Sequence, residues 1–520
     1  MISRKLVSAG AAAALDREAA SDWGLHPFAL VEAAGRTCAR VLVKSGFFKE
    51  PSPRICVLAG SGNNGADALV MLRALILDKR AGPGNSLVLV NRLSGMEAVS
   101  PRSEALKALA ALEVPVRLWE GGESLFQWNA DIVIDGIAGT GLRGPLQDIP
   151  ADMAGALQRL RQEGPGRRNG GRRPLILSID VPSGLFDGWH PGMPILQADL
   201  TLGIEPLKLA FYKPAARIFG GGLLPVGGIF PLPLMDRYGE GELLRWKELC
   251  RTMPPIAPDA YKYSRGVVEI RAGSPGSAGA ARIAARGAQA AGGGMVRLLV
   301  DDALYPVLAA SAGGIMVAPA SAGDGNGGEE GRFVPDAVLL GPGWGRGADR
   351  QRALEAALVR EKNGTPLILD ADAVALARGR RFSGHAVLTP HPGEFTALTG
   401  IPKEQVLADP VPLLRRTAQE IGGVLLFKGH VLYIAAPDGR LGVLDGMAPV
   451  LAAGGTGDLL AGFCAALAAR MRRSPEGFDG YACAAIAAAL LLQTGKSARG
   501  FLDPLELADT AAALAGKAWL

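Results

Sequence analysis

The sharpest chemical pattern in the sequence is a run of small residues that ends in an acid. LAAGGTGDLLAG (451–462) places Gly454, Gly455 and Gly457 before Asp458, and an apolar stretch with helical spacing follows. Free backbone N–H groups at a helix start bind anions, and an acid beside them can move a proton. An Asp at this place can also be a plain N-cap, but the small residues before it favour a phosphate site with an acid–base group.

Four other segments of the same half place polar residues after apolar runs. TPHPGEF (389–395) contains His391, and LLFKGHVLYI (425–434) contains Lys428. His391 can be a turn residue and Lys428 a surface charge, but a lysine at a strand end also suits a nucleotide phosphate. LGPGWGRG and LILDADAVAL are further strand-end loops. Together these segments predict one site in the second half of the chain.

The first half contains a glycine-rich turn between a strand and a helix. In VLAGSGNNGADALV, Gly60, Gly62 and Gly65 permit a tight turn, and we expect the helix to start near Ala66. The start of that helix would offer N–H groups to a phosphate. The pattern is not GxGxxG, so hydride transfer is not the default function.

Two acids end later strands of the first half. Asp135 precedes the loop Gly139–Gly141, and Asp180 precedes Ser183. Each acid alone can be a turn former. Ligands of parallel α/β sheets lie beyond the carboxyl ends of the strands, so we expect these groups to converge on the glycine-rich turn.

Apolar runs of strand length alternate with helical segments along both halves, and they are expected to position these residues. Runs without polar alternation indicate strands buried on both faces, so each half is predicted to be a doubly wound parallel α/β domain. The predicted strands span 54–60, 86–91, 131–136, 174–180 and 199–204, then 267–273, 295–300, 336–341, 366–372, 385–389 and 424–429. A long Ala-rich helical stretch follows from Thr456.

The strand pattern breaks between the two halves. MPPIAP (253–258) is rich in proline and is a predicted linker. We therefore predict two domains, 1–245 and 255–520. The inserts at 162–173 and 321–331 are predicted surface loops.

Composition excludes several classes of protein. The 520 residues carry 55 basic and 50 acidic side chains, too balanced for charge alone to indicate nucleic-acid binding. Five dispersed cysteines support neither a disulfide framework nor a zinc site. Ser8 is a predicted cap of an Ala-rich helix, which we prefer to a signal peptide, and the apolar run near 482–495 is too short to span a bilayer. We expect a soluble cytoplasmic protein with buried, reduced thiols.

Three segments of the first half resemble the YjeF N-terminal domain, the NAD(P)HX epimerase: NNGAD (63–67), DGIAGTGLRGP (135–145) and SIDVPSGL (178–185). The resemblance implies a Rossmann-like domain in which Asp180 is catalytic and works at the reacting ring. It implies a potassium ion near Asn64, Asp135 and Ser183. It places the substrate against Asn63, Asn64, Gly65, Ala66, Asp67, Gly139, Thr140, Gly141, Leu142, Arg143, Gly144, Pro145 and Asp180. Ala66 and Ala68 stand where that family has glycine.

The motifs GGTGD, HPGE, GPGWG, DADA and KG of the second half resemble the YjeF C-terminal domain, a ribokinase-like ADP- or ATP-dependent NAD(P)HX dehydratase. The resemblance implies that Asp458 is catalytic. It assigns substrate contacts to Ala280, Gly345, His391 and Asp458, and nucleotide contacts to Lys428, Gly429, His430, Val431, Leu432 and Gly457. YKYSRG (261–266) and Ala375 depart from the pattern of that family.

Together the two resemblances imply a bifunctional repair enzyme for hydrated nicotinamide cofactors. The first domain would interconvert R- and S-NAD(P)HX, and the second would use ADP, or ATP, to dehydrate the S form to NAD(P)H, giving AMP from ADP. K⁺ and Mg²⁺ are the expected metal ions, and we expect a homo-oligomer with no nucleic-acid or membrane partner. Two alternatives stay open: a ribokinase-like kinase for a small alcohol, and a first domain that is a non-catalytic scaffold.

Overall fold

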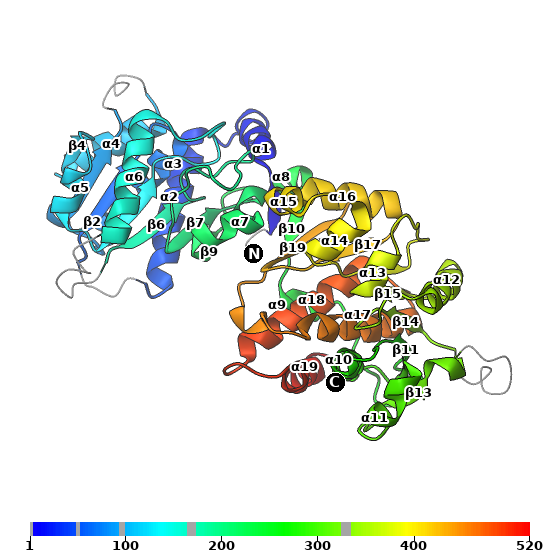
Figure 1. The fold of residues 1–520 in the computed structure, drawn as a ribbon. Helices are drawn as coiled ribbons and strands as arrows, with labels where there is room; N and C mark the ends of the chain where they lie inside the picture. Colours follow the sequence, from blue (N-terminus) through cyan, green and yellow to red (C-terminus); the bar gives the residue numbers. More distant parts are fainter. Residues whose placement is uncertain (1–3, 48–51, 93–98, 164–172, 324–333) are drawn as a thin grey trace. The chain divides into compact units, whose positions relative to one another are not determined.

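The computed structural model describes residues 4–47, 52–92, 99–163, 173–323 and 334–520. The chain forms two compact units, Met1–Glu242 and Leu243–Leu520, each built from strands and helices in alternation (Figure 1). The predicted inserts at 162–173 and 321–331 fall largely outside the described residues.

The described residues of the first unit form a seven-stranded sheet in which every pairing is parallel. Its strands stand in the order β4-β3-β2-β5-β6-β7-β9. They span β2 (Ile55–Ala59), β3 (Ser86–Val90), β4 (Val116–Leu118), β5 (Ile132–Gly136), β6 (Leu175–Ile179), β7 (Leu200–Ile204) and β9 (Gly222–Val226). The five predicted strands are confirmed. The edge strands β4 and β9 were missed, because β4 has three residues and β9 contains Gly222 and Pro225.

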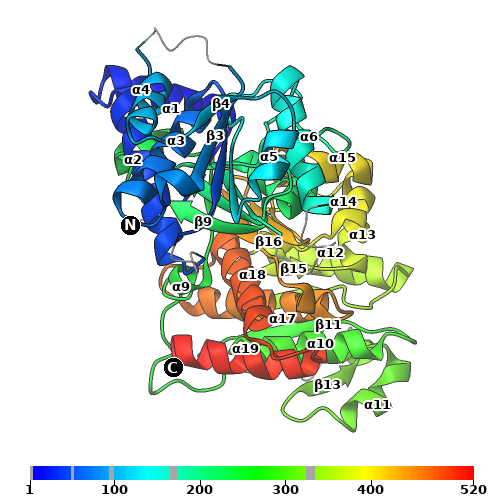
Figure 2. The ribbon, with the colours of Figure 1, turned by 90° about the vertical axis from the view of Figure 1, so that its left-hand side faces the viewer.

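Successive residues of these strands face opposite sides of the sheet, and helices cover both sides. Ile55, Val57 and Ala59 pack with α2, α3 and α4, whereas Cys56 and Leu58 pack with α5 and α6. Figure 2 shows the two helical layers. The helices are α1 (Ala9–Ser21), α2 (Pro27–Lys44), α3 (Asn63–Leu77), α4 (Pro101–Ala111), α5 (Glu123–Trp128), α6 (Asp148–Glu163), α7 (Pro214–Arg217) and α8 (Leu232–Tyr238). The doubly wound architecture is therefore confirmed for this unit.

The N-terminal segment of the first unit is a strand followed by the predicted helix. The Ser8 side chain caps α1 by accepting a hydrogen bond from the backbone N–H of Ala11 at 3.2 Å. The preceding strand, β1 (Lys5–Val7), pairs in parallel with β8 (Leu207–Lys208) and antiparallel with β10 (Gly241–Leu243). The pairing with β8 fixes the backbone that carries Lys208.

The sheet of the second unit is parallel at one end and antiparallel at the other. Its order is β13-β12-β11-β14-β15-β16-β17-β18-β19, and the pairings β17–β18 and β18–β19 are antiparallel. The strands span β11 (Val267–Arg271), β12 (Met295–Val300), β13 (Met316–Pro319), β14 (Ala337–Leu340), β15 (Leu367–Leu369), β16 (Ala386–Leu388), β17 (Val424–Phe427), β18 (Val431–Ala435) and β19 (Leu441–Asp445). The predicted doubly wound α/β domain is confirmed, and the antiparallel extension at its end was not predicted. Two apolar runs separated by Lys428, Gly429 and His430 form a hairpin, a signal present in the sequence.

Small residues let the helices of the second unit approach closely. A side-chain carbon at Gly462 of α17 would lie 2.1 Å from the backbone oxygen of Ala284, and one at Gly287 of α10 would lie 2.7 Å from that of Leu459. This contact fixes the helix whose first turn carries Asp458. The helices are α9 (Trp246–Leu249), α10 (Ala278–Ala290), α11 (Tyr305–Ala309), α12 (Ala348–Lys362), α13 (Asp372–Leu376), α14 (Pro392–Thr399), α15 (Lys403–Ala408), α16 (Pro410–Ile421), α17 (Thr456–Arg473), α18 (Gly480–Ser497) and α19 (Pro504–Trp519).

The Ala-rich helices α17, α18 and α19 pack into the core of the second unit. Among the described residues, no helix combines the length and apolar character that crossing a bilayer requires. The five cysteines are free thiols, and only Cys250 is not buried.

Candidate active sites

Asp135 ties together two loops at the carboxyl ends of β5 and β6. The carboxylate is fully buried and accepts hydrogen bonds from the Ser178 hydroxyl at 2.7 Å, from the Ser183 backbone N–H at 3.0 Å and hydroxyl, and from the Ile137 backbone N–H at 3.2 Å. Burial nevertheless raises its pKa. The structure thus brings Asp135 and Ser183 together, as expected.

Helix α3 begins three residues earlier than predicted, at Asn63, with Gly62 as its N-cap. Two close approaches explain why glycine stands on both sides of this start. A side-chain carbon at Gly65 would lie 2.4 Å from the backbone oxygen of Gly60, and one at Gly60 would lie 1.8 Å from the backbone oxygen of Ile137. Only glycine fits at either position without a shift of the backbone. The free N–H groups of this helix therefore belong to its first turn, within the predicted 63–67 segment.

Asn64 lies against the turn after β5. A side-chain carbon at Gly139 would approach the Asn64 side chain to 3.0 Å. The amide nitrogen of Asn64 is buried and has no hydrogen-bond partner among the described residues. The rest of the predicted 139–145 segment forms this partly exposed turn, with Arg143 exposed. Asn64, Asp135, Ser183 and Gly139 therefore belong to one cluster.

Ala66 and Ala68 are buried helical residues, and neither has a positive φ. Alanine thus carries no backbone strain at either position. Space for the Ala68 methyl group exists because residue 136 is glycine: a side-chain carbon there would lie 2.6 Å from the Ala68 Cβ.

Asp180 follows β6 directly and forms a buried ion pair that the sequence did not predict. Its Oδ1 lies 2.8 Å from Nζ of Lys208, and the two side chains are 9% and 7% exposed. Lys208 belongs to no sequence motif, so only the pairing of β8 beside the strand ends, seen in the structure, indicates its place in the site.

Asp67 is also buried, and burial raises its pKa well above the usual range, with the charge of Asp180 adding to the rise.

Asp458 is the third residue of α17 and is not its N-cap. The cap is Gly455, whose φ is +92°. The carboxyl group is half-buried and has no hydrogen bond or ion pair among the described residues. The N-cap alternative is therefore wrong, and Asp458 stands beside the free N–H groups of its helix.

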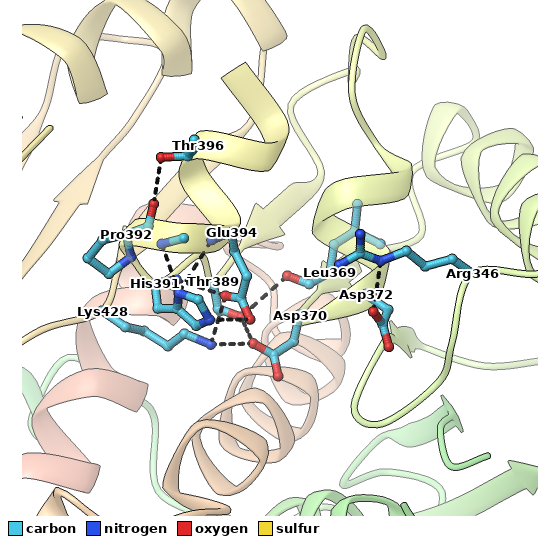
Figure 3. A network of polar contacts seen from close by, with 11 residues as sticks. Arg346, Leu369, Asp370, Asp372, Thr389, His391, Pro392, Glu394, Thr396 and Lys428 are labelled. Atoms are coloured by element: carbon cyan, nitrogen blue, oxygen red, sulfur yellow. Dashed lines mark hydrogen bonds and ion pairs between the residues drawn. The ribbon is translucent and has the colours of Figure 1, made fainter. Parts of the chain in front are cut away.

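Lys428 lies in an ion-pair network after the ends of β15, β16 and β17 (Figure 3). Its Nζ is 2.6 Å from Oδ1 of Asp370 and 3.4 Å from Oε2 of Glu394, and the Thr389 hydroxyl donates to the same Asp370 oxygen at 2.6 Å. A side-chain carbon at Gly457 would lie 3.4 Å from that Nζ, so the network reaches the turn before Asp458. The surface-charge alternative for Lys428 is wrong. The sequence did not predict a role for Asp370, which directly follows β15, or for Glu394, which lies in the first turn of α14.

The charges of this network set the protonation of Asp458. Burial raises the pKa of Asp458 to about 7, and the negative charges of Asp370 and Glu394 add to the rise while Lys428 opposes it. Burial lowers the pKa of Lys428, but the two carboxylates outweigh burial and raise it overall. Asp458 therefore changes its protonation near neutral pH, as an acid–base group requires.

The other predicted residues of the second unit lie on neighbouring loops. His391 is the N-cap of α14: its Nδ1 accepts from the Gly393 backbone N–H at 2.9 Å, and its exposed ring has Nε2 3.3 Å from Glu394. The Gly345 backbone N–H donates to Asp372 at 2.8 Å, near the Arg346 side chain shown in Figure 3.

Ala280, in the first turn of α10, faces the GPGWG loop, since a side-chain carbon at Gly343 would lie 3.0 Å from its Cβ. The side chains of Val431 and Leu432 are buried in β18. Burial thus leaves Lys428, Gly429, His430 and the backbone as the parts of this predicted nucleotide segment that could contact a ligand.

The fold and the two sites define a class: a two-unit α/β protein in which each unit places acidic groups beside a glycine-lined helix start. Residues 27–210 match the family described as YjeF-related protein N-terminus, and residues 268–511 match the family described as NAD(P)H-hydrate dehydratase.

Two curated relatives carry the name bifunctional NAD(P)H-hydrate repair enzyme Nnr. The Salinibacter ruber protein is 30% identical over 511 residues, with 89% of this chain and 88% of that protein covered. The Escherichia coli protein is 31% identical over 468 residues, with 87% and 82% covered. An ADP/ATP-dependent NAD(P)H-hydrate dehydratase from Bacillus subtilis, co-crystallised with ATP and Mg²⁺, is 24% identical, with 53% of this chain and 99% of that chain covered and a TM-score of 0.46. The chain belongs to the family of bifunctional NAD(P)H-hydrate repair enzymes.

Proposed function

We propose that the first unit epimerises NAD(P)HX and that the second unit dehydrates the S epimer at the expense of ADP or ATP. Water adds to the enamine of a reduced nicotinamide ring and leaves a hydroxyl on the carbon beside the ring nitrogen, so two epimers arise. The observation that carries the proposal is the placement of Asp458, unpaired and with a pKa of about 7, between free helix N–H groups and the Lys428 network.

In the second unit, Asp458 takes the proton of the substrate hydroxyl while that oxygen attacks the terminal phosphate of ADP. The C–O bond then breaks, inorganic phosphate leaves, and the proton of the adjacent carbon goes to the phosphate. The products are NAD(P)H, phosphate and AMP. The N–H groups at the start of α17 stabilise the phosphate charge.

Lys428 is proposed to bind the nucleotide phosphate without leaving its carboxylates. An ammonium has three N–H donors, and two point to Asp370 and Glu394, so the third is available. Gly457 leaves the space beside Nζ open, because a side-chain carbon there would lie 3.4 Å from it.

Magnesium fits this site as a partner of the nucleotide. Within the described residues, no three His, Cys, Asp or Glu side chains form a group able to hold a metal alone. Mg²⁺ commonly uses one or two carboxylates together with substrate phosphates, and Asp370 and Glu394 are the carboxylates beside Lys428. The ion would neutralise phosphate charge during transfer.

In the first unit, Asp180 is proposed to move the proton of epimerisation. Inversion at the hydroxyl-bearing carbon requires a bond to oxygen or to ring nitrogen to break and re-form on the other face, and each path moves one proton away and back. The first turn of α3 would bind the phosphates of the dinucleotide. Asp180 stands at a strand end in the same unit.

Potassium fits the cluster around Asn64. Hard cations take oxygen ligands, and the cluster offers amide, hydroxyl and carboxylate oxygens. The side-chain amide nitrogen of Asn64 has no partner among the described residues, which supports a bound ion beside it. If the amide group is turned by 180°, its oxygen takes the place of that nitrogen and can coordinate the ion. Asn64, Asp135 and Ser183 would hold the ion, which would help to fix the turn at Gly139.

The test uses the purified chain with hydrated NADH as a mixture of epimers and ADP or ATP. Full recovery of the absorbance of reduced nicotinamide, with R and S followed by chiral chromatography, is expected. Recovery that stops when the S epimer is exhausted would show that the first unit is a scaffold. Phosphorylation of a small alcohol by ATP, without recovery of NADH, would favour the kinase alternative. The homo-oligomer and the cytoplasmic location stay predictions.

A further inference from the structure

The Asp180 carboxylate is held through one oxygen. Oδ1 accepts the Lys208 ammonium at 2.8 Å and the Ile204 backbone N–H at 3.3 Å. The other oxygen, Oδ2, has no partner among the described residues, and Asp180 keeps 9% of its surface exposed. The two oxygens therefore differ: one is anchored and the other is available.

Lys208 is itself anchored. Besides Asp180, its Nζ donates to the backbone oxygen of Ile204 at 3.0 Å. Its backbone is fixed by the parallel pairing of β8 with β1, in which Val7 faces Lys208. Asp180 adopts a φ of +64°, a conformation that few non-glycine residues take without local support. The ammonium thus connects the carboxylate to the end of β7.

Three further groups face this pair from separate helices. Asp16 on α1 and Asp67 on α3 interact electrostatically with both Asp180 and Lys208, and Cys38 on α2 interacts with Asp67 and Asp180. Lys208 opposes the rise in the pKa of both Asp16 and Asp67. Without its cation, Asp180 would face these two acids with no compensating charge beside it.

Building on the proposed epimerase function, we propose that Lys208 is a positioning residue for this reaction. It holds Oδ1 of Asp180 so that Oδ2 accepts and returns the proton of the epimerised centre. Lys208 acts through Asp180 and touches no reacting atom.

The test compares Lys208→Met and Lys208→Arg with the wild-type protein, each as the full chain, with pure R epimer as substrate. Lys208→Met should lower kcat of R-to-S conversion on the order of 10²-fold, with little change in KM, since binding groups stay in place. The acid limb of its kcat/KM profile should move to higher pH, because loss of a neighbouring cation raises the pKa of a carboxyl group. Lys208→Arg should lower kcat without moving this limb, because it keeps the charge but changes its geometry.

Two controls separate this role from general damage. Lys213→Met removes another buried lysine, whose Nζ donates to the backbone oxygens of Asp187 and Trp189, and should leave kcat and the acid limb unchanged. Dehydration of pure S epimer by the same preparations reports an intact second unit. If Lys208→Met does not fold, Lys208→Arg decides, because it leaves no buried carboxylate without a cation.

A wild-type kcat in Lys208→Arg, or a wild-type kcat and unmoved acid limb in Lys208→Met, would overturn the positioning role. A change confined to KM would also overturn it. If the wild-type chain itself leaves the R epimer unchanged, the proposed epimerase function has failed instead, and this result is distinct from any difference among the variants.

Discussion

The two units use the same three parts, a lysine, a carboxylate proposed to be catalytic and a helix start, but connect them differently. In the first unit the lysine binds the proposed catalytic carboxylate itself, with Lys208 on Asp180. In the second unit Lys428 binds Asp370 and Glu394, and Asp458 is left unpaired with a pKa of about 7. The lysine of the first unit thus holds the carboxylate proposed to react, whereas the lysine of the second unit leaves it without an ion pair, with a pKa of about 7.

The glycine-rich turns at the starts of α3 and α17 also differ, in the space around their glycines. In the first unit, side chains at Gly60 and Gly65 would collide with backbone oxygens. In the second unit, Gly454 has open space around it, and Gly457 has only the end of Lys428 near it. The first turn therefore uses Gly60 and Gly65 for packing. The second turn has one such glycine, Gly455, where an added carbon would lie 2.7 Å from the Ile283 side chain, and its other glycines keep room for a ligand.

The largest expected effect is separation of the two reactions by single substitutions. Asp458→Ala should lower dehydration on the order of 10³-fold, because it removes the acid–base group, while R-to-S conversion continues. Recovery of the absorbance of reduced nicotinamide measures the first reaction, and chiral chromatography measures the second. The melting temperature should hardly change, since the Asp458 side chain makes no hydrogen bond among the described residues. Unchanged recovery would refute its assignment.

A smaller effect concerns the pH profile of dehydration. A base must be ionised, so kcat/KM for the S epimer should fall as the pH drops below about 7, the pKa of Asp458. Asp370→Asn should move this limb to lower pH, because the Asp370 charge raises that pKa, and Lys428→Met should move it to higher pH, because Lys428 lowers it. If the acid limb moved in the same direction in both variants, Asp370 and Lys428 would not act on the pKa of Asp458 with opposite signs, and the contrast with the Asp180–Lys208 pair of the first unit would fail.

The smallest effect tests the packing role of the first glycine turn. Gly65→Ala should lower the free energy of unfolding of the first unit by about 1–3 kcal/mol, since the new methyl group meets the Gly60 backbone oxygen. Gly62→Ala is the matched control, because nothing lies within 4 Å of the added carbon and its φ is −93°. Urea denaturation of both variants measures the difference, and equal stability would remove the distinction between the two turns.

The sequence predicted most of what forms locally and little of what depends on distant pairing. Continuous apolar runs predicted the central strands, and the glycine-rich turns and strand-end acids predicted both candidate sites. Lys208 was missed because its role arises from the pairing of β8 with β1, about 200 residues earlier in the sequence. The antiparallel end of the second sheet was not predicted, because Lys428 and Gly429 between two apolar runs fit a nucleotide loop as well as a hairpin.

The contact between Ala68 and Gly136 ties two distant positions of the chain to each other. The interface between α3 and β5 has room for a single methyl group, contributed here by the helix. A chain that places this methyl on the strand must give up the one on the helix and must also accommodate the Asn64 backbone oxygen, 3.0 Å from the added carbon. The effect of a substitution at residue 68 therefore depends on the residue at 136, and the reverse. A mutant library that varies these positions one at a time would underestimate which residues each position accepts.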